Sequence, residues 1–386
     1  MNKQFEKAID GLIDSILSKY TPAKYDEVRR RSALCWNGGY PDDKLVYAVM
    51  ENPAWKRGYF DIPGKITSME QTLLWGLMAI DKFADWDCDY YCGVMSGLKQ
   101  VTLPSYFGCR EIVSGGDTAV EPAFHTVDDI YRKKAVGVVK GTTAYEILEN
   151  MAYSQERTHG LLPIYITDMQ GPFSVAAQVY GMENFMTLLY DDPEAAKFLL
   201  QRCTDCIIEY FKKMKGLIGP NLVPLHCHPL LYMPSDKGVA VSDDFFAITS
   251  PEIVEEFSAP YLEQIGAEFG GIVVHSCGSI DHLLKTINGI KNLTGINFSS
   301  TESNLPMLAQ KLKKDLTIIC HNSAVTCNGR KLLSQAEQIE HCADVVRETG
   351  AKIMCIAFGF NEPRFPEECK GAFAKYAELQ IKNGMK

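Results

Sequence analysis

The sequence predicts an α/β protein, a closed (β/α)8 barrel of the TIM type with additional helices at its N-terminus. Short apolar runs alternate with helix-like segments over about 300 residues, a pattern typical of parallel strands joined by helices. No Gly-x-Gly-x-x-Gly turn accompanies them, which disfavours an open dinucleotide-binding sheet. We therefore expect an N-terminal helical extension over residues 1–84, packed on a barrel that occupies residues 85–386.

The individual elements follow from local patterns. Apolar residues recur at helical spacing from Phe5 to Ile16 and from Met69 to Phe83. Helix starts are expected at Asp191-Asp192-Pro193-Glu194 and at Ser250-Pro251-Glu252, which combine an N-cap residue, a proline and an acidic first turn. A barrel of this type needs an eighth strand, but no further apolar run marks its position. Residues 101–150 are the candidate region for this strand. The other seven strand candidates are Cys88–Cys92, Pro163–Thr167, Leu222–Cys227, Gly271–His275, Thr294–Phe298, Leu316–Cys320 and Lys352–Ala357.

Composition limits the kinds of function. The 386 residues are 46% hydrophobic and 23% charged, enough for a large core. A net charge of −9 without a basic stripe argues against nucleic acid as a partner. No apolar run approaches the roughly 20 residues that cross a bilayer. The N-terminal residues have the pattern of an amphipathic helix and not of a secretory signal. The 13 cysteines are therefore expected to be free thiols or metal ligands in a reducing cytoplasm.

The most informative segment runs from Gly271 to Gly278, an apolar β-branched run that ends in His275-Ser276-Cys277. Residues two apart on a strand share a face, so the imidazole and the thiol are expected to point the same way. This donor pair suits a borderline-soft metal, and zinc is the first candidate. Reactive groups in such barrels lie at the C-terminal ends of the strands, where four of the eight histidines are predicted to fall: His226, His228, His275 and His321.

A metal site needs at least one more ligand. Cys355 is the predicted third ligand, and Cys227 and Cys320 compete with it. Three protein ligands would leave an open coordination position, which is a catalytic arrangement. The lone Cys203-x-x-Cys206 lies in a helical stretch and is interpreted as core packing.

Other polar residues at predicted strand ends are candidates for chemistry or for capping. His226, His228 and His321 are general acid–base candidates. Asp168 orients substrate or a ligand histidine, or caps a helix, with about even weight. Asn297 and Asn322 donate hydrogen bonds to substrate, or cap their strands.

Three segments resemble the uroporphyrinogen decarboxylase superfamily, and its corrinoid-dependent methyltransferase branch more than its decarboxylases. Asp168 to Gly181 is similar to the family's Gly-Pro-x-x-x-Ala turn. Ser250 to Leu262 is similar to the helix before the metal strand, and Gly271 to Ile280 to that strand itself. The resemblance covers roughly residues 65–380 and rests on the order and spacing of the three segments.

The resemblance implies a barrel with extra N-terminal helices and a His-x-Cys…Cys zinc site. In that branch the zinc activates a thiol that accepts a methyl group from methylcobalamin on a separate corrinoid protein. Other members move a methyl group from a methylated donor to the corrinoid.

This chain departs from the family pattern in two places. The family's last cysteine would fall near Gly359, about one strand step beyond Cys355, so His226, His228 or Cys320 remain alternative ligands. The decarboxylases carry an Arg-Gln-x-Gly-Arg motif that grips carboxylates, and the nearest region, Arg29 to Trp36, lacks it.

The sequence therefore predicts a cytoplasmic, zinc-dependent methyltransferase of a corrinoid system. His275, Cys277 and Cys355 are its predicted metal ligands. Its expected partners are a corrinoid protein and a small-molecule methyl donor or thiol acceptor. A metal-free decarboxylase and a non-catalytic metal- or corrinoid-binding barrel are the two alternatives.

Overall fold

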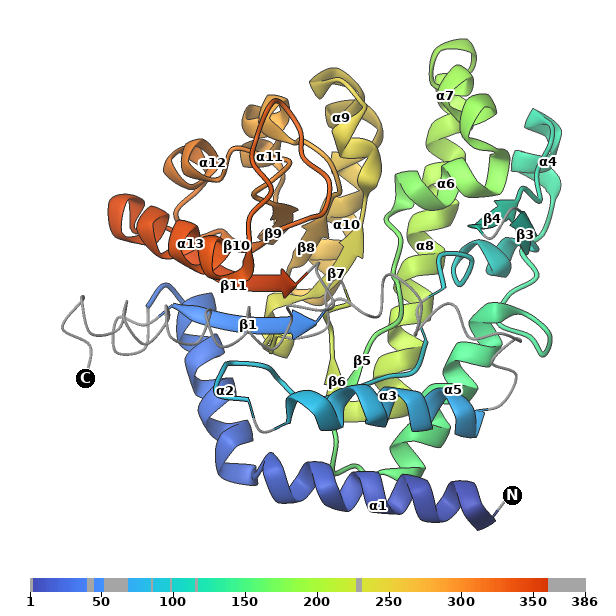
Figure 1. The fold of residues 1–386 in the computed structure, drawn as a ribbon. Coiled ribbons are helices and arrows are strands. Elements are labelled where there is room, and N and C mark those ends of the chain that lie inside the picture. Colours follow the sequence, from blue (N-terminus) through green and yellow to red (C-terminus); the bar gives the residue numbers. More distant parts are fainter. Residues whose placement is uncertain are drawn as a thin grey trace.

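A ring of parallel strands forms the centre of the computed structural model, which describes residues 3–39, 45–51, 69–84, 86–97, 99–114, 117–226 and 231–359 (Figure 1). Six strands pair in the order β1-β11-β10-β9-β8-β7, and three more pair as β2-β5-β6. The strands of the ring are β1 (Val46–Glu51), β2 (Val94–Met95), β5 (Ile164–Tyr165), β6 (Leu222–Val223), β7 (Val239–Ser242), β8 (Ile272–His275), β9 (Leu293–Ser299), β10 (Thr317–His321) and β11 (Lys352–Gly359).

Backbone hydrogen bonds join the two sets of strands into a closed ring. The N–H of Ala240 on β7 donates to the carbonyl oxygen of Pro224, just after β6, at 2.9 Å. On the other side, the N–H of Asp89 donates to the carbonyl oxygen of Tyr47 on β1 at 2.7 Å. The predicted (β/α)8-type barrel is confirmed. The ring contains one strand more than eight, because β1 precedes the eight in the sequence and pairs with β11.

The ring strands are apolar because helices cover them from outside. β7, β8, β10 and β11 are buried along their whole length, as expected where both faces of a parallel strand are covered. The helices are α1 (Lys3–Lys19), α2 (Pro22–Trp36), α3 (Met69–Phe83), α4 (Val127–Arg132), α5 (Thr143–Arg157), α6 (Pro172–Tyr180), α7 (Met182–Asp191), α8 (Pro193–Ile218), α9 (Pro251–Phe257), α10 (Ala259–Phe269), α11 (Leu284–Gly289), α12 (Leu305–Lys311) and α13 (Gln335–Thr349).

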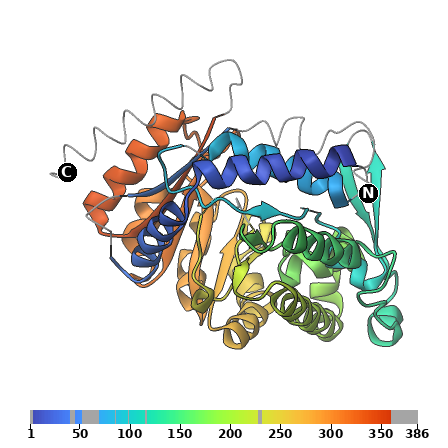
Figure 2. The same ribbon diagram turned by 90° about the horizontal axis from the view of Figure 1, so that it is seen from below.

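Several helices begin where the sequence predicts. The side chain of Asp192 accepts a hydrogen bond from the N–H of Ala195 at the start of α8, and Ser250 does the same for Ile253 in α9. The two cysteines of the Cys-x-x-Cys segment are buried in α8, so their interpretation as core packing is confirmed. Figure 2 shows α1 lying along α3 on the outside of the barrel.

Three details differ from the prediction. The eighth strand is β7, not a segment of residues 101–150, which instead contain an antiparallel hairpin of β3 (Arg110–Ser114) and β4 (Asp117–Glu121) followed by α4 and α5. The first of the eight strands that follow β1 is β2, beyond the predicted Cys88–Cys92. The region expected to be helical contains β1, which pairs in parallel with β11. The division of the chain at residue 84 stays a prediction.

The strand directions decide where functional groups can meet. All ring strands run parallel, so the C-terminal ends of β7, β8, β9 and β10 come to one edge of the barrel. Within the described residues, no helix is long and apolar enough to cross a membrane.

Candidate metal centre

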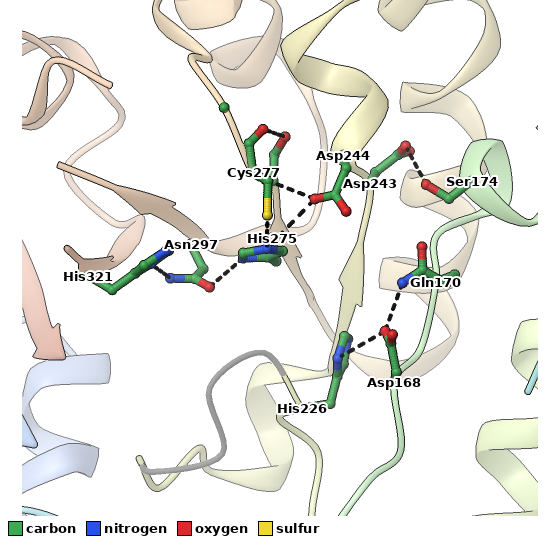
Figure 3. Close-up of polar contacts among 12 residues, drawn as sticks. Asp168, Gln170, Ser174, His226, Asp243, Asp244, His275, Cys277, Asn297 and His321 are labelled. Atoms are coloured by element: carbon green, nitrogen blue, oxygen red, sulfur yellow. Dashed lines mark hydrogen bonds and ion pairs between the residues drawn. The ribbon is translucent and has the colours of Figure 1, made fainter. Parts of the chain in front are cut away.

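Strand register brings the predicted His-x-Cys segment together with side chains from neighbouring strands (Figure 3). His275 ends β8 and lies opposite Asn297 on β9, and Asn297 lies opposite Ile319 on β10. His321 follows Ile319 by two residues and so lies on the same face of β10. These residues are buried, so the mouth of the barrel has a polar layer at this level.

Asp244, His275 and Cys277 form a cluster with the composition of a metal site. One ligand atom from each lies within 4.8 Å of the others. Nε2 of His275 is 3.3 Å from Sγ of Cys277 and 3.7 Å from Oδ1 of Asp244. Bonds of about 2.0–2.3 Å to a tetrahedral zinc ion place neighbouring ligand atoms about 3.3–3.8 Å apart. The donor set therefore fits zinc in both chemistry and spacing.

Asn297 prepares His275 for this role. Nδ2 of Asn297 donates to the carbonyl oxygen of Ile319 at 2.7 Å, which turns Oδ1 toward Nδ1 of His275 at 2.6 Å. Because an amide oxygen only accepts hydrogen bonds, the imidazole proton must be on Nδ1. Nε2 then presents its lone pair to the cluster, the arrangement usual for metal-ligating histidines.

The cysteine of the cluster is held in its neutral form by its surroundings. The residue is exposed, but burial of its thiol, followed by the negative charges of Asp244 and Glu302, raises the pKa of Cys277 above its ordinary value. The N–H of Cys277 also donates to Oδ1 of Asp244 at 2.8 Å. A dication bound in the cluster would instead favour the thiolate form of Cys277, because a coordinating thiol loses its proton.

Cys355 lies elsewhere, contrary to its prediction as the third ligand. It is fully buried in the middle of β11, in register with Cys320 on β10. Its thiol contacts Cys342 on α13, which covers the outside of the barrel. The thiol of Cys320 also faces this helix, since Nε2 of Gln338 donates to it at 3.6 Å. The third member of the cluster is Asp244, not the predicted Cys355.

A second pair, Asp168 and His226, lies across from the cluster (Figure 3). Oδ1 of Asp168 is 3.6 Å from Nδ1 of His226 and accepts a hydrogen bond of 2.8 Å from Nε2 of Gln170. Burial and then the charge of Asp244 raise the pKa of Asp168 to about 6. Burial and then the charge of His275 lower the pKa of His226 to about 3. Near neutral pH the pair is therefore an ionised carboxylate beside a neutral imidazole.

Of the remaining predicted site residues, one lies beside His275, one bonds to the neighbouring strand, and one lies outside the described residues. His321 is buried with its ring 6.0 Å from that of His275, and burial lowers its pKa well below the ordinary value. Asn322, directly after β10, forms two hydrogen bonds to the backbone of β11. Its side-chain amide donates to the carbonyl oxygen of Phe358 and accepts from the N–H of the same residue. His228 and the competing Cys227 lie outside the described residues.

The sequence prediction included Asp168 but missed three other acidic residues of the site, Asp243, Asp244 and Glu302. Asp243 and Asp244 directly follow β7, so the unrecognised run Val239–Ser242 was the signal that could have found them. Ser174 and Ser258 donate to the fully buried Asp243 at 3.2 and 2.9 Å, and burial raises its pKa to about 7. Glu302 follows β9 and is likewise buried.

Comparison with known proteins agrees with this architecture. Residues 98–216 match the family "Uroporphyrinogen decarboxylase (URO-D)". A segment of 134 residues is 28% identical to a methylated-thiol–coenzyme M methyltransferase from Methanosarcina mazei, over 34% of this chain and 32% of that protein. A solved methyltransferase from Methanosarcina mazei superposes with a TM-score of 0.66 at 16% identity, over 91% of this chain and 98% of the other.

The resemblance to the uroporphyrinogen decarboxylase superfamily is confirmed. The curated relative is named as a methyltransferase, in agreement with the predicted branch. The solved methyltransferase, at 16% identity, supports the fold. The similar segment spans only 32% of the curated relative's length. The family match at residues 98–216 ends before the residues of the candidate metal centre.

Proposed function

We propose that this chain is a zinc-dependent methyltransferase of a corrinoid system. It would move a methyl group between a methylated small molecule or thiol and a cobalamin carried by a partner protein. The observation that carries the proposal is the Asp244–His275–Cys277 cluster at the C-terminal edge of a superfamily barrel. The curated relative, named for methyl transfer involving thiols, supports it.

The residues of the cluster would have distinct tasks. Asp244, His275 and Cys277 would hold the metal, and Asn297 would orient the imidazole. Bound zinc would supply Lewis acidity, which favours the thiolate form of a coordinated substrate thiol. With methylcobalamin as donor, a sulfur–carbon bond forms, the cobalt–carbon bond breaks, and its electron pair remains on cobalt.

The Asp168–His226 pair would position substrate on the other side of the centre. His226 is a poor proton acceptor near neutral pH because its pKa is about 3. We therefore assign it a hydrogen-bonding task, with Asp168 as the charged member of the pair. The cytoplasmic location and the corrinoid partner belong to the same proposal.

Metal content and methyl transfer test the proposal together. Protein without a His tag is purified anaerobically, and zinc is measured against protein. We expect close to one zinc per chain. We also expect conversion of methylcobalamin to cob(I)alamin with at least one thiol of a panel, or conversion of cob(I)alamin to methylcobalamin with at least one methoxylated aromatic. His275→Ala should lose both the metal and the conversion.

Two outcomes would contradict the proposal. Metal-free protein that releases carbon dioxide from a carboxylated substrate would favour the decarboxylase for which the matching family is named. Zinc-loaded protein that transfers no methyl group with any donor or acceptor, also in the presence of a corrinoid protein, would indicate a binding role.

A further inference from the structure

The residue before Asp244 is fixed through its backbone on both sides. Asp243 is fully buried, and its N–H donates to the carbonyl oxygen of His275, at the end of β8, at 2.8 Å. Its carbonyl oxygen accepts a hydrogen bond of 3.1 Å from the N–H of Phe246, within the short 3-10 helix η6 (Asp244–Ala247). The backbone at Asp244 is therefore connected both to the strand that carries His275 and to the turn that follows β7.

The carboxylate of Asp243 connects the same point to two helices. Ser174 of α6 donates to its Oδ1 at 3.2 Å (Figure 3). Ser258, at the start of α10, donates to its Oδ2 at 2.9 Å. Both serines are buried, and both oxygens of the carboxylate are used. A buried polar network with its members satisfied is rigid, so the side chain and the backbone of Asp243 have one defined position.

The segment that carries Asp168 closes around Asp243 from a third direction. The N–H of Gly171 donates to the carbonyl oxygen of Ser242 at 2.6 Å, and the N–H of Ser242 donates to that of Met169 at 2.8 Å. A Cβ on Gly171 would lie 3.2 Å from the carbonyl oxygen of Ser242 and 3.3 Å from Oδ2 of Asp243. The close packing at Gly171 therefore limits where the Asp243 side chain can lie.

The side chains of Asp243 and Asp244 point in different directions (Figure 3). Asp243 points to the serines of α6 and α10, away from the cluster. Oδ1 of Asp244 lies 3.7 Å from Nε2 of His275 and accepts a hydrogen bond of 2.8 Å from the N–H of Cys277. The Asp244 side chain is 44% exposed, so packing does little to restrict its rotamers. Its place in the cluster depends on the backbone that Asp243 fixes.

We propose that Asp243 is a positioning residue for the metal centre, which keeps Asp244 within reach of an ion bound by His275 and Cys277. This inference rests on the proposed function and adds a residue that touches neither metal nor substrate. Without the two serine hydrogen bonds the turn after β7 gains freedom, and the carboxylate of Asp244 spends less time at coordination distance.

A double-mutant cycle on zinc affinity separates positioning from general stability. Zinc dissociation constants are measured against a competing chelator on the full chain, for Asp243→Ala, Asp244→Ala and the double variant. We expect Asp243→Ala to weaken zinc binding by about 10–100-fold in the parent, but by less than about twofold once Asp244 is alanine. A merely structural role would weaken binding by the same factor in both backgrounds.

Three further variants check the route of the effect. In Asp243→Asn an amide can bond both serine hydroxyls, which donate and accept, so zinc affinity should stay within about fivefold of the parent. Gly171→Ala pushes against Asp243 without removing its carboxylate, and it should weaken zinc binding by at least about threefold only while Asp244 is present. Thr158→Ala should leave zinc affinity unchanged, because Thr158 is equally buried but precedes β5 at the opposite edge of the barrel.

The outcomes separate this inference from the proposed function. Equal losses of zinc affinity from Asp243→Ala in both backgrounds, or no loss, would overturn the role of Asp243 while zinc content and methyl transfer of the parent stand. Unchanged affinity in Asp244→Ala would overturn it too, since Asp243 then has no ligand to position. If Asp243→Ala does not fold, the same comparison with Gly171→Ala decides. A parent without zinc or methyl transfer would overturn the proposed function, and this inference with it.

Discussion

Oδ1 of Asn297 lies 2.6 Å from Nδ1 of His275, although the two residues are on different strands and 22 positions apart. The contact is set by strand register, since Asn297 is the partner of His275 across the β8–β9 pair. The same amide donates to the carbonyl oxygen of Ile319 on β10. Asn297 thus fixes the imidazole through two neighbouring strands, which would make it a positioning residue for the proposed metal centre.

Removal of the Asn297 side chain should weaken metal binding without removing a ligand. We expect Asn297→Ala to lower zinc affinity by about 10–100-fold, because the imidazole loses the partner that fixes its tautomer and orientation. Competition with a zinc chelator measures this change. Asn304→Ala is a suitable control, since Asn304 caps α12 through the N–H of Met307. Equal zinc affinity in Asn297→Ala and the parent would refute the role of Asn297.

The ligand set can be tested by contrasting two cysteines. Cys277→Ala should abolish near-stoichiometric zinc, and Asp244→Asn should lower zinc affinity strongly, because both remove atoms of the cluster. Cys355→Ala should keep full zinc occupancy and lower the free energy of unfolding by roughly 1 kcal/mol, the effect of a small cavity behind β11. Elemental analysis and urea denaturation measure the two effects. Loss of zinc in Cys355→Ala alone would return that residue to the site.

The strands that the sequence predicts best are β8, β9, β10 and β11, whose observed bounds differ from the predicted ones by two residues or fewer. Burial on both faces does not by itself make a strand predictable, because the fully buried β7 was missed. β7 escaped prediction because only Val239, Ala240 and Val241 separate Gly238 from Ser242. β2 is two residues long, so its strand character comes from its pairing with β5 and not from a run of its own.

The site could be predicted only where local periodicity suffices. His275 and Cys277 come from one segment, and their shared direction follows from alternation along a strand. Cys355 was chosen by its position in the chain, which does not tell which face of β11 it occupies. Register places it beside Cys320, toward α13. Asp244 could not be predicted as a member of the cluster while the strand before it was unrecognised.

Asp243 should make stability depend on pH in the metal-free protein. Its pKa is about 7 in the folded chain and about 3.9 when unfolded, so the folded state binds more protons between these values. Its contribution to stability is therefore complete below about pH 4 and is lost as pH rises through 7. Relative to Asp243→Asn, the free energy of unfolding of the parent should fall by up to about 4 kcal/mol over this range.

Urea denaturation from pH 4.5 to 7.5 with a chelator measures this difference. His226, with a lowered pKa, contributes an opposite slope, but it is present in both proteins and cancels in the comparison. A flat difference for Asp243→Asn would show that Asp243 titrates normally.

The close approach of Gly238 and Gly271 should make the start of β7 intolerant of any side chain. Gly238 has a φ of +94°, and a Cβ there would collide with the carbonyl group of Gly271, just before β8. We expect Gly238→Ala to lower the free energy of unfolding by roughly 3 kcal/mol or more, through backbone strain and displacement of the two strands. The matched control is Gly216→Ala in α8, where an added Cβ meets no described atom within 4 Å. That change should raise stability by about 0.5–1 kcal/mol, because alanine favours helix. Thermal and urea unfolding measure both variants. If Gly238→Ala were as stable as the parent, the close approach of the two strands would be wrong, and with it the placement of Asp244 beside His275.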